Sequence, residues 1–206
     1  MSEQWQPDYG QKDFSIEKKE TLYDGFFKMY KLHLRHKTFA GEEILIQREL
    51  FWRDDAVCVV LYDARRQSVV LIEQFRVGVY DDPQGPWMLE LVAGIVEPGE
   101  GPHDVARREA VEEAGADLGE IMHITRFSPS TGATREYIDL LCAQVDSEGI
   151  GGLHGLEEEG EDIKVHTLPV KEAYALVRSG RINNAPAIIA LQWLELNQAE
   201  LDQRWG

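Results

Sequence analysis

The sequence predicts an α/β protein in which a mixed sheet packs between helices. Short β-branched and alternating runs are numerous, whereas only three stretches have helical spacing and helix-ending signals. These stretches do not alternate strictly with the strands, as they would in a purely parallel fold. No internal repeat interrupts the chain, and 206 residues are enough for one sizeable core but not for two full-sized domains.

The composition excludes several functions. The chain is 43% hydrophobic and 28% charged, and its formal net charge is −16. Such acidity argues against a sequence-independent grip on nucleic acid or on an anionic membrane surface, which need clustered Lys and Arg. No targeting core or long apolar run is present, and Cys58 and Cys142 form no CxxC pair. We therefore expect a cytoplasmic protein with two buried free thiols.

The strands are predicted from alternation and from β-branched runs. Residues 1–20 are polar and unpatterned, so we expect a loosely held arm there. "FKMYKLHLRH" and "EILIQRELFW" alternate as half-buried strands do. "AVCVVLYD" and "SVVLIEQFRV" predict a buried hairpin joined by "ARRQ". The remaining strand candidates are "WMLELVAG", "IMHITRF", "EYIDLLCAQV" and "IKVHTLP".

Three helices are expected, the first being "GPHDVARREAVEEAGA". Gly101 and Pro102 suit its start, and Gly115 suits the left-handed position after its end. The other two are "VKEAYALVRSG", stopped by Gly180, and "APAIIALQWLELNQ", with Pro186 in its first turn. The loops between the later elements are "SPSTGATR" and the Gly-rich acidic "DSEGIGGLHGLEEEGED".

The first helix gathers like charges that weaken it. Glu109, Glu112 and Glu113 lie within about 100° of one another on one face. Glu109 and Glu113 form an i,i+4 like-charge pair costing roughly 0.2–0.5 kcal/mol. Glu112 and Glu113 also meet the negative end of the helix dipole, at about 0.3–1 kcal/mol each. One interpretation is a solvated acidic face whose side chains splay apart. The other is a divalent-cation site, and carboxylates without His or Cys suit Mg²⁺ or Mn²⁺.

The spacing around this helix favours the cation site. From Gly94, five residues lead to Glu100 and seven more to Arg108-Glu109. Ala110, Glu112-Glu113, Gly115 and Ala116 complete a pattern that resembles the Nudix box without a gap. The resemblance implies a Nudix hydrolase, an α/β/α sandwich that cleaves a diphosphate linked to a nucleoside with divalent metal.

The resemblance also implies roles for the box residues. Glu109, Glu113 and the Ala93 carbonyl would bind metal, and Glu112 would add a further or water-bridged contact. Glu100 and Arg108 would orient the ligand carboxylates, although Arg108 alone could also be an ordinary helix-surface ion pair.

"LYDGFF", "VVLIEQFRVGVY", "LELVAGIVEPGE", "EDIKVH" and "RINNAPAIIALQWL" resemble the bacterial ADP-ribose pyrophosphatase branch. That branch forms AMP and ribose 5-phosphate and works as a homodimer with exchanged N-terminal strands. The resemblance implies an N-terminal arm and strand layer at 1–50 and a catalytic domain at 51–206. It also implies the following substrate contacts: Arg76 to the diphosphate, Arg48, Glu136, Ile95, Ser130, Thr131 and Gly132 elsewhere, and Phe26 or Phe27 stacked on adenine. Taken singly, Phe26 and Phe27 could instead be core or interface residues, and Arg48 a surface residue.

The Gly-rich acidic loop could simply be solvated and mobile, or it could close over the site with a general base. The resemblance places the base at Glu159 and another metal ligand at Glu161. One departure concerns substrate choice: Thr131 stands where the branch commonly has proline, and relatives of the branch cleave GDP-mannose.

Two other classes of function remain open. A non-catalytic Nudix sensor often lacks one of the Arg-Glu or Glu-Glu pairs, both of which are present here. An acidic Ca²⁺-binding protein would show EF-hand spacing, which the sequence lacks.

Overall fold

The computed structural model describes residues 5–156, 158 and 160–206. By packing, the chain forms two units. The first contains residues up to Asp54 together with Ser128–Glu136, and the second contains Asp55–Phe127 and Tyr137–Gly206. The division predicted at residues 50 and 51 concerns function and stays a prediction.

The first unit is a four-stranded sheet in the order β1-β2-β3-β9. Its strands are β1 (Phe14–Asp24), β2 (Lys28–Lys37), β3 (Glu43–Trp52) and β9 (Thr134–Arg135). A 3₁₀ turn, η1 (Gln11–Asp13), precedes β1. β2 and β3 pair antiparallel from Lys28–Trp52 to Lys37–Glu43, as the alternating runs predict.

The expectation of a loosely held arm over residues 1–20 was wrong from Phe14 onward. β1 pairs with β2 along its whole length, yet nearly all its side chains are exposed. A strand whose two faces are both exposed shows no hydrophobic alternation, so its sequence carried no signal. Backbone pairing and cross-strand charge pairs, such as Glu17 with Arg35, hold it instead.

The second unit is an α/β/α sandwich around a mixed sheet. The sheet order is β11-β12-β5-β4-β10-β8, with β6 paired to β5 and β7 paired to β4. β4 and β10 run parallel, and the other pairs are antiparallel. Its strands are β4 (Ala56–Asp63), β5 (Ser68–Phe75), β6 (Trp87–Glu90), β7 (Val92–Ile95), β8 (Ile121–Phe127), β10 (Ile138–Gln144), β11 (Gly152–His154) and β12 (Ile163–Pro169), with the 3₁₀ turn η2 (Val77–Val79) after β5.

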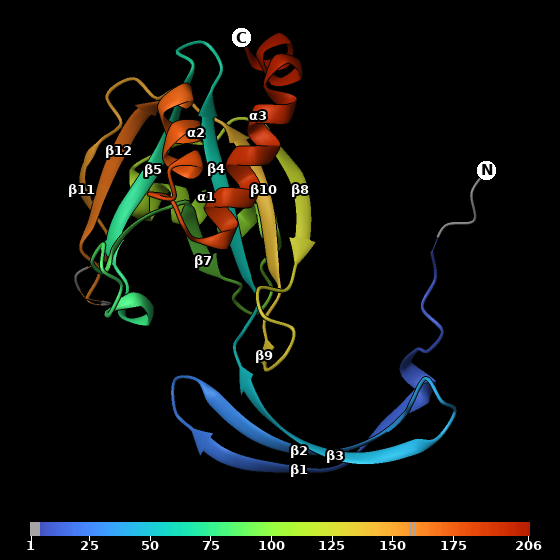
Figure 1. The fold of residues 1–206 in the computed structure, drawn as a ribbon. Coiled ribbons are helices and arrows are strands. Elements are labelled where there is room, and N and C mark those ends of the chain that lie inside the picture. Colours follow the sequence, from blue (N-terminus) through green and yellow to red (C-terminus); the bar gives the residue numbers. More distant parts are fainter. Residues whose placement is uncertain (1–4, 157, 159) are drawn as a thin grey trace. The chain divides into compact units, whose positions relative to one another are not determined.

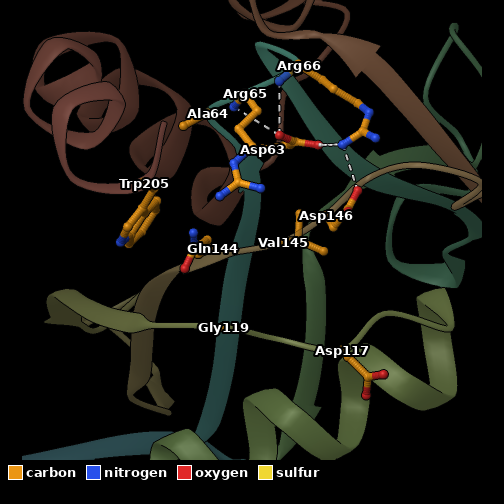
Figure 2. Close-up of a pocket in the computed structure, with 10 residues that line it drawn as sticks. All are labelled: Asp63, Ala64, Arg65, Arg66, Asp117, Gly119, Gln144, Val145, Asp146 and Trp205. Atoms are coloured by element: carbon orange, nitrogen blue, oxygen red, sulfur yellow. Dashed lines mark hydrogen bonds and ion pairs between the residues drawn. The ribbon is translucent and has the colours of Figure 1, made fainter.

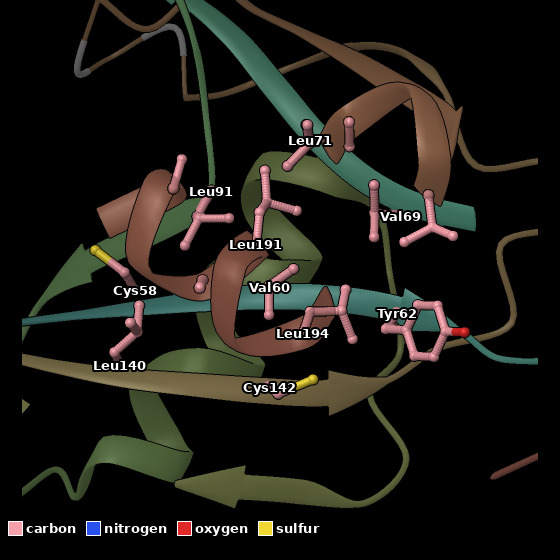
Figure 3. Close-up of a cluster of buried hydrophobic side chains, with 14 of the residues drawn as sticks. Cys58, Val60, Tyr62, Val69, Leu71, Leu91, Leu140, Cys142, Leu191 and Leu194 are labelled. Atoms are coloured by element: carbon pink, nitrogen blue, oxygen red, sulfur yellow. The ribbon is translucent and has the colours of Figure 1, made fainter. Parts of the chain in front are cut away.

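Helices cover both faces of this sheet (Figure 1), α1 (Pro102–Ala114) on one and α2 (Val170–Arg178) and α3 (Ala185–Trp205) on the other. The residues of β4 alternate between the two cores. Val57, Val59 and Leu61 pack toward α1, whereas Cys58, Val60 and Tyr62 pack toward Leu191 and Leu194 of α3 (Figure 3). Both cysteines are free and buried, as expected.

"WMLELVAG", expected as one strand, is two. β6 pairs with β5 from Trp87–Phe75 to Glu90–Ile72, whereas β7 pairs with β4 from Val92–Val59 to Ile95–Ala56. β4 and β5 pair with each other only between Leu61–Asp63 and Ser68–Val70. The chain therefore changes partner at the buried Leu91 and fills the space where β4 and β5 diverge.

Two other expected elements differ in extent. α3 continues past the expected "APAIIALQWLELNQ" to Trp205, because Leu201 and Trp205 are also buried. The Gly-rich acidic loop contains the short strand β11, which pairs with β12. No helix in the described part of the chain combines the length and apolar character needed to cross a bilayer.

Candidate active site

The acidic residues are positioned by α1 and by the strand that runs into it. Gly101 caps the helix, and its N–H donates to Asp104 Oδ2 at 2.9 Å. Gly115 ends it at φ 60°, the left-handed conformation expected there. Ala106, Ala110 and Ala114 are buried, so α1 lies close to the sheet and its neighbouring carboxylates are drawn toward β7.

Glu113 is only 2% exposed. The backbone N–H of Ala93, in β7, donates to its Oε2 at 2.9 Å. Burial raises the pKa of Glu113 to about 8, and the charges of Glu109 and Glu161 act in the same direction, while Arg76 opposes them. A neighbouring positive charge would strongly stabilise the ionised form of a buried carboxylate with a pKa this high.

Glu109 reaches the sheet because Gly94 has no side chain. A Cβ at position 94 would overlap the Glu109 carboxylate. The first position of the box therefore has a steric reason to be glycine. Burial raises the pKa of Glu109, Arg108 lowers it, and the charges of Glu112 and Glu161 raise it again.

Arg108 joins four acceptors. Its Nε and Nη2 form a fork on Glu100 at 3.0 and 3.1 Å. Its Nη1 donates to Glu109 at 2.6 Å and to Glu112 at 3.2 Å, and Nη2 also reaches the Ile95 carbonyl at 3.3 Å. The hydrogen bond to Glu100 is the main cause of a raised Arg108 pKa. Arg108 thus acts as an internal counter-ion for the acidic helix.

Arg76 and Glu90 were not predicted to form a pair. Arg76 follows β5, and its Nε donates to Glu90 Oε2, in β6, at 2.6 Å. The Arg76 charge also lowers the pKa of Glu113, so the guanidinium lies in the field of the acidic cluster. Sequence reasoning missed Glu90 because its partner is brought near by strand register, which no local pattern reveals.

The Gly-rich acidic loop meets the C-terminal end of α1. The Gly155 N–H donates to the Glu112 carbonyl at 3.4 Å. Glu161 accepts from the Leu156 N–H at 3.4 Å, and a Cβ at Gly155 would lie 2.9 Å from Glu161 Cβ. The general base predicted at Glu159 lies outside the described residues.

The negative charge of Glu161 therefore raises the pKa of both Glu109 and Glu113, and Glu109 acts on Glu113 in the same direction. Among the described residues, no three His, Cys, Asp or Glu side chains converge as ready-made metal ligands. Both carboxylates already have hydrogen-bond partners, since Arg108 donates to Glu109 and the Ala93 N–H donates to Glu113. The metal-ligand assignments stay predictions.

The other predicted substrate contacts belong to the first unit. Phe26 is 83% exposed beside the β1–β2 turn, and its ring meets that of Phe27 edge-on at 4.8 Å. Phe27 also contacts Phe51, so it is partly a packing residue. Arg48 lies on β3 and donates to the Gln47 carbonyl. Glu136 is buried and forms an ion pair with Arg53 at 3.4 Å.

Ser130, Thr131 and Gly132 lie in an exposed turn before β9, where the Ser130 carbonyl accepts from the Thr134 N–H at 3.1 Å. Within the second unit, the structure brings together Arg76, Ala93, Ile95, Glu100, Arg108, Glu109, Glu112, Glu113 and Glu161.

A separate pocket of about 250 Å³ in the second unit includes none of these carboxylates. Arg65, Gln144 and Trp205 line it, together with Asp63 and Arg66 (Figure 2). Arg66 lies between Asp63 and Asp146, at 3.2 and 2.7 Å. These charges are already paired with each other, so the acidic cluster on α1 is the better candidate for catalysis.

Known proteins resemble this chain over nearly its full length. An ADP-ribose pyrophosphatase of Haemophilus influenzae is 44% identical over 201 residues, covering 96% of this chain and 93% of that protein. A GDP-mannose pyrophosphatase of Escherichia coli is 29% identical over 188 residues, covering 90% and 97%. A crystal structure of an ADP compounds hydrolase shares the fold, with a TM-score of 0.68 at 20% identity, covering 92% of this chain and 98% of that one.

Residues 52–205 match the NUDIX domain family. This range contains the α/β/α sandwich and all the carboxylates gathered on α1. The chain belongs to the Nudix family.

Proposed function

We propose that this protein hydrolyses the diphosphate of ADP-ribose, giving AMP and ribose 5-phosphate. The observation that carries the proposal is the pair of the partly buried Glu109 and the buried Glu113, with the charge of Arg76 acting on Glu113. The 44% identity with an ADP-ribose pyrophosphatase, over 96% of this chain, supports the choice of substrate.

The donor set fits a hard divalent cation. Every donor is an oxygen, from Glu109, Glu113, Glu161 and the Ala93 carbonyl, which suits Mg²⁺, or else Mn²⁺. The raised pKa values of Glu109 and Glu113 agree with a cation site, because a bound cation would favour the ionised form of both carboxylates. When bound there, more than one such ion would neutralise phosphate charge and activate the attacking water.

The side chains around this set have separate tasks. Glu100 holds Arg108 by a two-bond fork, and Arg108 in turn orients Glu109 and Glu112. Arg76 is half-exposed and can form charge-assisted hydrogen bonds to the diphosphate. The attacking water gives its proton to a carboxylate, for which we assign Glu159, with Glu112 or Glu158 as the next candidates. The bond between phosphorus and the bridging oxygen then breaks.

For residues of the first unit, the proposal keeps the substrate contacts that the family resemblance implies, each as a prediction. Phe26 offers an exposed ring for stacking on adenine, and Arg48, Glu136 and residues 130–132 contact the rest of ADP-ribose. Ile95, at the end of β7, is exposed beside the box and adds an apolar contact.

We also propose a homodimer. Among the described residues of the first unit, several exposed side chains on its strands are large and apolar, namely Phe14, Ile16, Leu22, Tyr23, Ile44 and Leu45. Exposed apolar residues of this kind mark protein interfaces. The proposal places the protein in the cytoplasm, and the net charge of −16 agrees with a protein that binds neither nucleic acid nor an anionic membrane surface.

A turnover screen tests the reaction. Purified protein with Mg²⁺ should convert ADP-ribose to AMP and ribose 5-phosphate, separated by chromatography, and a chelator should abolish the conversion. Glu113→Gln should remove most activity while the protein stays folded, because neutralising a buried carboxylate costs the fold little. Glu159→Gln should lower kcat by roughly 10²–10⁴-fold with KM near the wild-type value.

The same screen separates the alternatives. Faster turnover of GDP-mannose than of ADP-ribose would make GDP-mannose the preferred substrate. The 29% identical GDP-mannose pyrophosphatase raises this possibility. Binding without turnover of any nucleoside diphosphate sugar would indicate a sensor. Full activity of Glu113→Gln with unchanged metal demand would contradict the metal assignment.

A further inference from the structure

Gln74 is a buried polar residue that the proposed reaction leaves without a role. It is 6% exposed and lies one residue from the end of β5. Among the described residues, its Nε2 has no hydrogen-bond partner, and it is the one buried side-chain nitrogen or oxygen of which this is true. Such an amide is costly to bury unless a partner arrives in some state of the protein.

Strand alternation places the Gln74 side chain on the α1 face of the sheet. In β5, Val70 and Ile72 belong to the core under α1, whereas Val69 and Leu71 belong to the core under α2 and α3. Gln74 has the parity of Ile72 and therefore points to the α1 side. This is the side from which Glu109 and Glu113 approach β7.

The β5–β6 register also places Gln74 near Arg76, the positively charged side chain of the site. Gln74 pairs with Met88 of β6, and Ile72 pairs with Glu90. The Arg76 backbone N–H donates to the Pro86 carbonyl, one step further along the same ladder. The Arg76–Glu90 hydrogen bond thus spans the Gln74–Met88 pair, and the Arg76 charge acts on Glu113.

We propose that the Gln74 amide binds substrate, by donating a hydrogen bond from Nε2 to a phosphate oxygen of the bound diphosphate. The inference rests on the proposed function for the presence of a diphosphate. A neutral amide can serve here because it adds a donor next to Arg76 without adding charge to the acidic cluster. The hydrogen bond forms only when the ligand brings its oxygen.

The assignment predicts opposite effects on the free and the ligand-bound protein. Gln74→Met keeps the volume and removes an unpartnered amide, so the Tm of the metal-free protein should stay equal or rise. In contrast, the affinity for Mg²⁺ with a non-hydrolysable methylene analogue of ADP-ribose should fall roughly tenfold or more. The Tm increase caused by that pair of ligands should shrink accordingly, while the response to Mg²⁺ alone should stay near wild type.

Gln198→Met is the matched control, because that amide is already partnered. Gln198 lies on α3, across the sheet, where its Nε2 donates to Gln67 at 2.7 Å and its Oε1 accepts from the Tyr174 hydroxyl at 3.1 Å. Its Tm should fall without any change in analogue affinity.

A clear drop in the metal-free Tm of Gln74→Met would show that the amide serves the fold and would overturn the assignment. Unchanged analogue affinity would overturn it as well. If the wild type neither hydrolyses ADP-ribose nor binds the analogue, the proposed function fails. The Gln74 assignment is then tested by the affinity for inorganic pyrophosphate in the presence of Mg²⁺. Equal affinities of the wild type and Gln74→Met would reject it.

Discussion

Two buried carboxylates of the second unit have opposite pKa shifts, and their hydrogen bonds explain why. Glu113 accepts one bond from Ala93, and burial raises its pKa to about 8. Burial also acts to raise the pKa of Asp63, but bonds from Ser147 and Arg66 outweigh it and lower the value to about 2. Ser147 contributes both its N–H and its hydroxyl, at 2.9 and 2.7 Å. The additional donors on Asp63 favour its ionised form, whereas desolvation outweighs the single bond to Glu113.

Asp63 should make the fold sensitive to acid. Its folded pKa is about 2, below the ordinary 3.8, so its stabilising effect is present above pH 3.8 and is lost as pH falls toward 2. The shift corresponds to about 2 kcal/mol of unfolding free energy. Asp63→Asn should lose that contribution at pH 7, and its free energy of unfolding should fall less steeply as the pH is lowered. Urea unfolding from pH 2 to 7 measures both effects. The same change at the exposed Asp8 should leave the pH dependence of the unfolding free energy unchanged.

At the scale of elements, the contact between β7 and α1 sets the position of Glu109, one of the proposed metal-binding carboxylates. Gly94 and Glu109 meet where a side chain on β7 would occupy the same space as the carboxylate. The clash involves the free end of a flexible side chain, so Glu109 can rotate away at little cost to the fold. Its carboxylate would then leave the site.

Gly94→Ala should therefore separate activity from stability. We expect kcat/KM to fall by about 10²-fold, as for a displacement of roughly 1 Å in a positioned group, while the Tm changes by only a few degrees. Gly119→Ala is the control, since a Cβ there would meet only the Gln144 side chain, with Oε1 at 2.7 Å and Cβ and Cδ at 3.3 Å, away from the acidic cluster. Equal activity losses in the two variants would contradict the special role of Gly94.

How well each element could be predicted follows from its burial. The runs of β4 and β5 and the boundaries of α1 were confirmed, because buried faces and glycine or proline ends leave strong local signals. β1 was missed because both its faces are exposed. The division of "WMLELVAG" was missed because it depends on how β4 and β5 diverge, which no spacing within the run records.

The candidate site divides in the same way. The grouping of Glu100, Arg108, Glu109, Glu112 and Glu113 could be expected from the sequence, because a helix and a short loop bring them together locally, while their roles stay predictions. The Arg76–Glu90 pair and the position of Gln74 depend on the β5–β6 register. Residues that strand register brings together can be recognised only once the fold is known.

At the scale of the whole molecule, the exposed apolar residues of the first unit predict self-association. Light scattering should give twice the 23.4 kDa mass of one chain. Ile16→Glu places a charge on an exposed apolar position of β1 and should shift the mass toward one chain. Ser15→Glu, at the neighbouring exposed position, should not. A mass of one chain in an active wild-type preparation would contradict the homodimer.

The chain passes between the two packing units three times, after Asp54, after Phe127 and after Glu136. The first unit is therefore not a simple N-terminal extension, because its last strand, β9, comes from between two stretches of the second unit and pairs with β3. A gene fragment beginning at Asp55 would encode β9 without the strand that it pairs with. Recombination that exchanges the N-terminal strands would therefore have to carry residues 128–136 with them to keep the first packing unit whole.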